Sequence, residues 1–395
     1  MKIGIVGNGV SAITAVRELA RIEPGTKIDV FTDESHAYYP RPKLIDYIAG
    51  RVNEREVIQY DHDWYEKQGA QLHLSEAVRR VDGLTRSVVT QSSMHSDYDR
   101  VLISVGSYPF VPPIKGVDKP GVHVLRTLDD ATAIRDAAAS SEKPIVIGGG
   151  ILGTEMAAAM RERGKETIIV TNIDTILPAQ LDREGSAVLM KKLERMGIDI
   201  RLGFTCKEVI GTDRVTGVVS TAGDEISGDL VIAATGVKPN LEVAKQTGAA
   251  VAKGVVVDEH MQTSVDGVFA AGDCIEWKGA TWGIIPVALE TAKIAAQNMI
   301  KLGSVNYQGT IPSNTLQVAG IDLTSIGLFN PQSADYESIV KADPSKGTYL
   351  KAVIKGGIVV GGIALGDRRA AMKLRGLVNR RTDVSASKKT VFDSA

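Results

Sequence analysis

Two short glycine clusters, each placed between an apolar run and a helical run, are the residues of this chain best suited to chemistry. The first, Gly7 to Ala12, reads G-x-G-x-x-A, and the second, Gly148 to Gly153, reads G-x-G-x-x-G. In this pattern the first glycine forms the turn, the second lets the backbone approach a pyrophosphate, and the third small residue packs helix on strand. The helix N-terminus then faces the negative phosphates. The pattern predicts two dinucleotide sites, with Gly7, Gly9 and Ala12 in the first and Gly148, Gly150 and Gly153 in the second.

A carboxylate about 20 residues beyond such a turn binds the ribose of the dinucleotide. In the first unit Glu34 occupies this place, with Asp33 beside it as the competing candidate, and either could instead be a solvated turn carboxylate. In the second unit the place is taken by Thr171, and no carboxylate follows until Asp174. A neutral residue would not repel a 2′-phosphate, yet no arginine lies at this turn to bind one. The sequence therefore leaves both NADH and NADPH open.

A third signal is Gly272-Asp273, which follows a short apolar strand-like run. A carboxylate at a strand end can accept hydrogen bonds from a sugar-alcohol chain and can cap the next helix. Alone this pair is a weak pattern, because glycine–aspartate turns are common. It gains weight from its place after the two glycine clusters.

The elements that must position these residues follow from the apolar pattern. Residues 2–34 and 144–174 repeat the order strand, glycine turn, helix, strand. Short apolar runs alternating with helices predict buried parallel strands in doubly wound α/β domains. Strands are expected at 2–6, 27–31, 144–147 and 167–170, with the intervening helices ending near residues 22 and 163. Further strands are expected at 70–74, 87–90, 101–105, 314–319, 348–354 and 357–364, followed by a helix from about Arg368.

Composition narrows the class of protein. A chain of 395 residues suits two or three domains, and its 46 Lys and Arg against 47 Asp and Glu predict no nucleic-acid and no membrane partner. The two cysteines, Cys206 and Cys274, fit a reducing cytoplasm. They lie far apart without adjacent histidines, so no metal site is expected.

Two further segments, Ser104 to Ser107 and Ala234 to Asn240, complete a family pattern. Together with the glycine clusters and Gly272-Asp273, they resemble the pyridine nucleotide–disulfide oxidoreductase superfamily, in which two crossover strands join an FAD domain to a nicotinamide domain. The resemblance implies FAD and NAD(P)H as cofactors and adds Gly106 and Gly236 to the binding residues. It implies two doubly wound Rossmann-like α/β domains plus a small α+β C-terminal domain. The expected limits are 1–110 with 236–308 for FAD, 111–235 for NAD(P), 309–384 for the C-terminal domain and 385–395 for a loose tail.

The segment YYPRPKL, residues 38–44, indicates the branch of this family. Disulfide reductases carry catalytic cysteines in the comparable place, but this chain has none there, so the flavin is expected to be the final redox centre. The segment is similar to the Tyr-x-Arg-Pro stretch of NAD(P)H:rubredoxin reductases and of the flavin portion of nitrite reductases, where it lies against the isoalloxazine. The resemblance implies that Arg41 and Pro42 bind the flavin.

The expected catalytic pair rests on the same resemblance. Related ferredoxin reductases carry a lysine where this chain has Asp46, so Lys43 is the nearest replacement. By analogy Lys43 would pair with Glu155 near the point where nicotinamide meets flavin, orienting the nicotinamide and tuning the flavin. Local pairing of Lys43 with Asp46 is the equally weighted alternative.

The later part of the chain is similar to the same branch. Trp282 resembles a position near the pyrimidine end of the flavin, although a core tryptophan is almost as well supported. Residues 307–325 and 358–367 look like the third domain of rubredoxin reductases. Arg368, Arg369 and Lys373 on the following helix form a basic cluster that could dock an acidic electron carrier, with an ordinary solvated face as the simpler interpretation.

These observations predict an NAD(P)H oxidoreductase that passes electrons through FAD to a small redox protein such as rubredoxin. An NADH oxidase, or a subunit delivering electrons to a separate reductase, is an alternative with the same fold. A flavin-binding sensor with little turnover is an alternative of another class, favoured by the neutral Thr171. The oligomeric state is left open.

Overall fold

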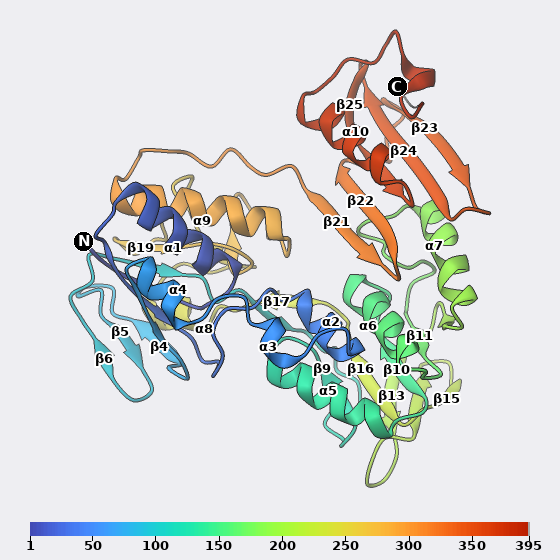
Figure 1. The fold of residues 1–395 in the computed structure, drawn as a ribbon, viewed down its shortest axis with the longest axis horizontal. Helices are drawn as coiled ribbons and strands as arrows, with labels where there is room; N and C mark the ends of the chain where they lie inside the picture. Colours follow the sequence, from blue (N-terminus) through green and yellow to red (C-terminus); the bar gives the residue numbers. More distant parts are fainter. Residues whose placement is uncertain (394–395) are drawn as a thin grey trace.

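Three five-stranded sheets organise the computed structural model, which describes residues 1–393 apart from the side chain of Lys389 (Figure 1). The first sheet has the order β19-β7-β1-β2-β3, and all its neighbouring strands are parallel. Helices α1 and α9 pack side by side against it. Its elements are β1 (Lys2–Val6), α1 (Val10–Ile22), β2 (Lys27–Phe31), α4 (His62–Lys67), β3 (Ala70–His73), β7 (Arg100–Ile103), α8 (Glu242–Thr247), β18 (Val255–Val256), β19 (Val268–Ala270), β20 (Ile275–Glu276) and α9 (Ile285–Ile300).

The second sheet repeats this plan with the order β12-β11-β10-β16-β9, again parallel throughout. Its central strand β10 is buried along its whole length, as expected for an apolar strand covered on both faces. The elements are β9 (Val122–Val124), α5 (Leu128–Ser140), β10 (Pro144–Ile147), α6 (Ile151–Glu162), β11 (Ile168–Val170), α7 (Arg183–Arg195), β12 (Asp199–Arg201) and β16 (Leu230–Ala233).

Each parallel sheet carries a small antiparallel insertion of three strands, most of which the sequence did not predict. These strands are short and partly exposed, so their apolar pattern is weak. They are β4 (Val78–Val81), β5 (Val88–Thr90) and β6 (Met94–His95) in the first part, and β13 (Cys206–Ile210), β14 (Gly217–Ser220) and β15 (Glu225–Ser227) in the second.

The two crossovers between these parts form a short antiparallel ribbon. Strand β8 (Ser107–Pro109) pairs with β17 (Val237–Pro239), with Lys238 opposite Tyr108. Helices α2 (Lys43–Ala49) and α3 (Glu54–Val57) belong by sequence to the first part. Nevertheless α2 packs against α5 and α6, and its buried Leu44, Tyr47 and Ile48 share a hydrophobic core with the second part.

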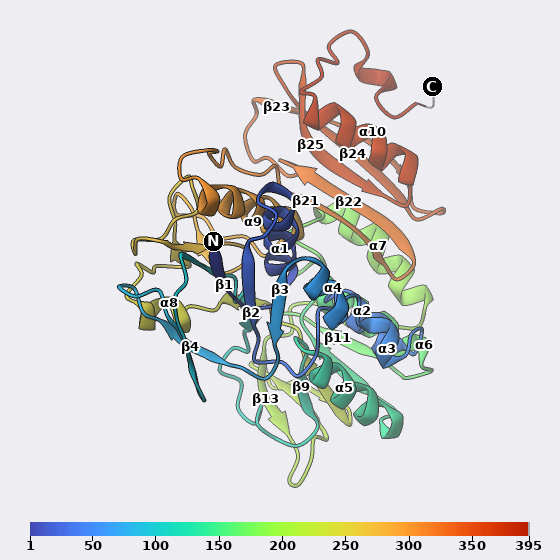
Figure 2. The ribbon, with the colours of Figure 1, turned by 60° about the vertical axis from the view of Figure 1, so that its left-hand side comes forward.

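The third sheet is antiparallel in the order β21-β22-β25-β24-β23, and helix α10 covers it. Figures 1 and 2 show this domain standing on α7 of the second part, where β24 makes the contact. The elements are β21 (Ser313–Val318), β22 (Ile321–Gly327), β23 (Tyr336–Asp343), β24 (Thr348–Lys355), β25 (Ile358–Leu365), α10 (Arg368–Asn379) and the 3₁₀ helix η1 (Lys388–Thr390).

A buried polar cluster holds the third domain to the second. The Lys351 ammonium lies 2.7 Å from the Asp182 carboxylate, and each side chain is 11% exposed. The Tyr349 hydroxyl donates to the same carboxylate at 2.8 Å. Asp182 also caps α7 by accepting from the backbone NH of Gly185.

The expectation of a loose tail from residue 385 is wrong for the part that the structure describes. The segment folds back onto the third domain, where Val391 is 3% exposed in the core beneath α10. The Lys373 ammonium donates to the carbonyl of Asp393 at 2.9 Å, and Lys388 pairs with Glu337 at 2.7 Å. Val391 and Phe392 are the two large apolar residues of this segment, and two are too few to form a helical or strand period.

This architecture confirms the predicted class of two doubly wound Rossmann-like domains and a small α+β C-terminal domain. The domain limits expected from the sequence stay a prediction, and α2 shows that packing does not follow them closely. Among residues 1–393, no helix is long and apolar enough to cross a membrane.

Candidate active site

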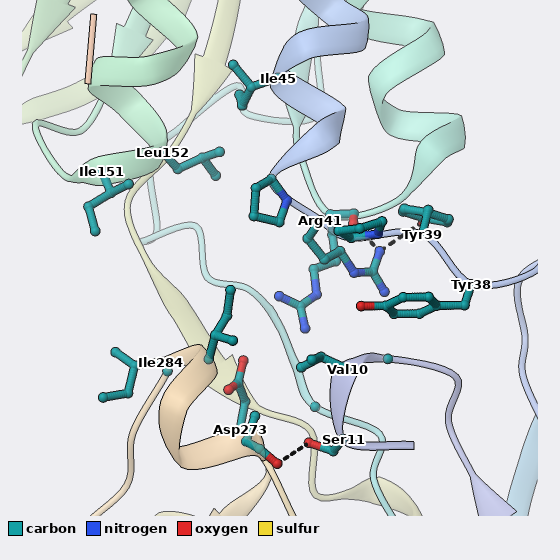
Figure 3. A pocket seen from close by; sticks show the side chains of 18 of the residues that line it. Val10, Ser11, Tyr38, Tyr39, Arg41, Ile45, Ile151, Leu152, Asp273 and Ile284 are labelled. Carbon is teal, nitrogen blue, oxygen red and sulfur yellow. Dashed lines mark hydrogen bonds between the residues drawn. The ribbon is translucent and has the colours of Figure 1, made fainter. Parts of the chain in front are cut away.

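A cavity of about 1300 Å³ lies where the two parallel-sheet domains meet the third domain. This volume exceeds the roughly 300–1,000 Å³ of an ordinary small-molecule pocket, so the cavity suits a long ligand. Its walls come from the turn after β1, residues 36–42, the first turns of α6, the start of α9 and strand β21. Figure 3 shows Ile151 and Leu152 of α6 on one side, with Val10 and Ser11 of α1 on the other.

The first glycine turn lies in this wall. Gly7 has φ +101°, and a Cβ there would lie 2.5 Å from the carbonyl oxygen of Ser104, so only glycine fits. Gly9 begins α1 and faces open space, as the close approach of a pyrophosphate requires. Ala12 is fully buried between helix and sheet and does not face the cavity. The three residues thus take the positions that the pattern predicts.

The predicted ribose carboxylate is engaged by neighbours from the Tyr-x-Arg-Pro segment. Arg41 donates to Glu34 at 2.8 Å, and the Tyr39 hydroxyl donates to the same carboxylate. Glu34, Asp33, Arg41 and Pro42 all line the cavity. Contact of Glu34 or Arg41 with a nucleotide stays a prediction.

Asp273 closes the other side of the cavity, accepting a hydrogen bond from the Ser107 hydroxyl at 3.1 Å. Burial raises the pKa of Asp273, and the positive charges of Arg126 and Arg41 oppose that rise. Its neighbour Gly272 has φ +86°, and a Cβ there would lie 2.3 Å from the hydroxyl of Ser11. This glycine therefore lets the turn after β19 approach the start of α1.

Sequence reasoning missed Arg126, which lines the same cavity. A Cβ on Gly106 would lie 3.0 Å from its Nη2, so Gly106 makes room for the guanidinium. Burial, and then the like charge of Arg41, lower the pKa of Arg126. Within residues 1–393 its guanidinium donates no hydrogen bond, so it is available to an anionic ligand. The signal in the sequence was an arginine directly before the capping box formed by Thr127 and Asp130.

The second glycine turn repeats the geometry of the first. Gly148 has φ +123°, and a Cβ there would lie 2.2 Å from the carbonyl oxygen of Ala234, while Gly150 begins α6 and faces open space. A Cβ on Gly153 would lie 2.0 Å from the carbonyl of Gly148. The turn lies outside the cavity wall, but α6 carries Ile151, Leu152 and Glu155 from the turn into it.

Three other residues predicted to contact the cofactors do not line the cavity. Thr171, 4% exposed, directly follows β11 and packs against Gly149. Trp282 is half-buried, while its neighbours Gly283 and Ile284 line the cavity. Gly236, with φ +115°, lies at the start of the β17 crossover. The roles of these three residues stay predictions.

An arginine side chain does lie at the turn after β11, contrary to the expectation from the sequence. Arg183, the first residue of α7, pairs with Asp174 of that turn, and both side chains are exposed. Local sequence could not show this, because the chain loops out between the two residues and returns.

Both pairings expected for Lys43 are wrong. Its ammonium donates instead to the backbone carbonyl of Glu56 at 2.8 Å, because α3 folds back over the start of α2. Asp46 pairs with Arg51 at 2.9 Å, and no cation of the described chain forms an ion pair with Glu155. Glu155 and Asp46 line the cavity, whereas Lys43 does not.

The cysteines are unsuited to catalysis. Neither lines the cavity, and burial raises the pKa of Cys206 to about 11 and shifts that of Cys274 in the same direction. A thiol with a raised pKa is a poor nucleophile.

Replacing both cysteines by alanine is therefore expected to leave the rate of dye reduction by NAD(P)H within about twofold of the parent. A loss of more than tenfold in steady-state turnover, in a variant that keeps its flavin absorbance, would contradict this view.

The fold pairs two parallel-sheet domains, each with a glycine turn before a helix, and the first turn and the helix after the second turn both border one cavity. The chain belongs to the pyridine nucleotide-disulphide oxidoreductase family, whose model matches residues 1–298. Residues 312–382 match the rubredoxin NAD+ reductase C-terminal domain. The resemblance drawn from the motifs is thus confirmed.

Comparisons with individual proteins agree with this family assignment. The chain is 31% identical to a nitrite reductase [NAD(P)H] of Bacillus subtilis over 386 residues, 98% of this chain but only 48% of the relative. It is 30% identical to the NADH-rubredoxin oxidoreductase of Clostridium acetobutylicum, covering 95% of this chain and 93% of that one. A ferredoxin reductase from Rhodopseudomonas palustris shares the fold, with a TM-score of 0.87 at 23% identity over 98% of this chain and 99% of that one. The chain spans about half the length of the nitrite reductase it matches.

The family uses FAD and NAD(P)H, and the residues of the cavity fit the first of these. Gly9 leaves room for a pyrophosphate, and the Arg126 guanidinium, which donates no hydrogen bond within residues 1–393, supplies positive charge to the same cavity. Asp273 and Glu34 offer carboxylate acceptors for the hydroxyl groups of a long sugar-alcohol chain and a ribose.

Proposed function

We propose that this chain transfers electrons from NAD(P)H, through FAD, to a small redox protein. The observation that carries the proposal concerns α6, which begins at the second glycine turn. The first turns of this helix form part of the wall of the cavity that the first glycine turn also borders. A nicotinamide bound at the second turn would thus reach a flavin bound at the first.

The residues would act mainly by binding and orientation. Gly7, Gly9 and Arg126 would hold the FAD pyrophosphate, and Asp273 its sugar-alcohol chain. Gly148 and Gly150 would hold the nicotinamide dinucleotide. When bound, FAD supplies a two-electron acceptor that can pass its electrons on singly. The apolar side chains Ile151, Leu152 and Ile284 would exclude water from the reacting region.

A protein acceptor is supported by the third domain and by the relatives. The NADH-rubredoxin oxidoreductase has nearly the same length as this chain, and its C-terminal domain family matches here. Arg368, Arg369 and Arg375 are exposed on α10, and Arg375 also lines the cavity. This face would attract an acidic carrier. Lys373, expected to join it, is held by the segment before residue 394.

The half-length match to nitrite reductase favours one second candidate, an electron-delivering subunit or module of a larger reductase. An oxidase and a sensor with little turnover are outcomes that the test below distinguishes. A cytoplasmic location stays a prediction from the two cysteines.

The first experiment is an anaerobic titration of the FAD-loaded protein with NADH and, separately, NADPH. One equivalent of the preferred nucleotide is expected to bleach the oxidised flavin absorbance within seconds. Adding a rubredoxin should then restore the absorbance faster than adding oxygen does. No bleaching with either nucleotide would contradict the proposal and favour the sensor, and faster reoxidation by oxygen would favour the oxidase.

A further inference from the structure

Four charged side chains meet where α2 of the first part packs against α6 of the second. Asp46 lies on α2 and Arg51 just after it, while Glu155 and Glu162 lie on α6. All four line the cavity. Two helices from different dinucleotide domains therefore present one arginine and three carboxyl groups to the same wall.

Arg51 links two of the other three side chains, one on α2 and one on α6. Its guanidinium donates to Asp46 at 2.9 Å and forms a two-pronged contact with Glu162, at 2.8 and 2.7 Å. The Asp46, Arg51 and Glu162 side chains are 42%, 44% and 40% exposed. Such a pair contributes little to stability. The contacts of Arg51 with Asp46 and Glu162 do hold the Asp46 carboxylate and the Arg51 guanidinium in fixed positions.

Glu155 is the member of the group without a partner. Among the described residues no hydrogen bond reaches its carboxyl group. Burial is the largest influence and raises the pKa of Glu155 to about 7; the Asp46 carboxylate adds to the rise, and Arg51 opposes it. Arg375 of α10 lines the same cavity farther along, and the β21 residues there, among them Asn314 and Gln317, are uncharged.

The proposed reaction releases one proton, which a basic group in this cavity can accept. Oxidation of one NAD(P)H by two one-electron acceptors yields NAD(P)+, two reduced acceptors and one proton. The electron pair of the broken C–H bond leaves with the acceptors, so the proton is left for a base to take up. A carboxylate that titrates near neutral pH can accept it and return it to water.

We propose that Glu155 accepts this proton and that Arg51 is the positioning residue that tunes it, by holding the Asp46 charge beside it. The inference rests on the proposed function. Glu155 becomes a carboxylic acid on taking up the proton and a carboxylate again on releasing it through the open side of the cavity. Arg51 would act through Asp46 and through its own charge.

The test uses two substitutions with opposite expected signs. Arg51→Gln removes the positive charge that opposes the rise and leaves Asp46 uncompensated, so the pKa of Glu155 should rise further. Asp46→Asn removes a negative charge and frees Arg51, so the pKa of Glu155 should fall. Each shift should be roughly 0.5–1 pH unit, less than the 1–3 units of a fully buried charge because Arg51 is 44% exposed.

The readout is the infrared band of protonated carboxyl groups in the FAD-loaded protein, titrated with pH, with the Glu155→Gln spectrum subtracted. A midpoint near pH 7 is expected for the parent, and the same shifts should appear in the pH profile of flavin reoxidation by a one-electron dye. Arg51→Lys keeps the charge and should restore most of the parent midpoint. Arg55→Gln removes an equal charge from the exposed surface nearby and should leave the midpoint unchanged.

Shifts of the same sign in the two variants, or a reoxidation profile that Glu155→Gln leaves intact, would overturn the inference. Glu162→Gln weakens the link between α2 and α6 but keeps Arg51 on Asp46, and the loss of its negative charge can by itself only lower the pKa of Glu155. A rise with Glu162→Gln as large as with Arg51→Gln would therefore assign the effect to domain placement instead. The infrared midpoint can be measured even if NAD(P)H fails to reduce the flavin, so failure of this inference and failure of the proposed function are distinguishable.

Discussion

Reduction of the flavin by NAD(P)H is expected to slow by at least about 100-fold in Gly148→Ala, while FAD stays bound. Gly148 has φ +123°, where a side chain is strained, and its Cβ would lie 2.2 Å from the backbone of Ala234. Relief of this overlap must displace either the turn or β16, and with it the anion site at the start of α6. A loss of about 2.7 kcal/mol in nucleotide binding corresponds to this factor of 100.

The measurement is anaerobic stopped-flow bleaching at a fixed nucleotide concentration, with bound FAD quantified after denaturation. Gly164→Ala is the matched control, because Gly164 also has a positive φ, +81°, but a Cβ there would meet nothing within 4 Å. It should keep at least half of the parent rate. Parent-like reduction in Gly148→Ala would mean that the second turn is not the nicotinamide site.

The second large effect concerns the third domain. Lys351→Met should lower the free energy of unfolding by about 3 kcal/mol, because it leaves the Asp182 carboxylate buried without its cation. Urea unfolding followed by circular dichroism measures the loss, in FAD-saturated protein so that cofactor binding is constant. An unchanged unfolding midpoint would show that Tyr349 and the α7 backbone suffice for Asp182.

The double variant Lys351→Met, Asp182→Asn completes this experiment. Asparagine still caps a helix N-terminus, so α7 should keep its cap while the orphaned charge disappears. Most of the lost stability should therefore return. With the Asp182→Asn single variant added, the double-mutant cycle measures the coupling of the pair.

The elements that could be predicted are those that a continuous local pattern of residues determines. Strands 2–6, 27–31 and 144–147 have the predicted limits, because each is an apolar run bounded by polar or glycine residues. The two glycine turns were predictable for a similar reason, since a positive φ and a close approach leave glycine no substitute at Gly7 and Gly148. The short insertion strands carry no such signal.

The candidate site was only partly predictable, because its charges pair across distance. Lys43 was chosen as the partner of Glu155 for its place in a motif, yet the backbone of Glu56 takes its ammonium. Arg51 and Glu162 lie 111 residues apart and form an ion pair that no local pattern predicted. Arg126 was overlooked because one arginine before a helix is ordinary until a cavity is seen beside it.

The packing of α2 has a consequence for the design of chimeras in which the second parallel-sheet part is exchanged between relatives. Its Leu44, Tyr47 and Ile48 complete the core of the second parallel-sheet part, although they lie some 60 residues before that part begins in sequence. A graft cut at residues 111 and 235 would leave a bare apolar face on the transplanted piece and an unsupported helix in the recipient. The second part is thus built from two separate stretches of the chain, and a working chimera must carry residues 39–57 along with it.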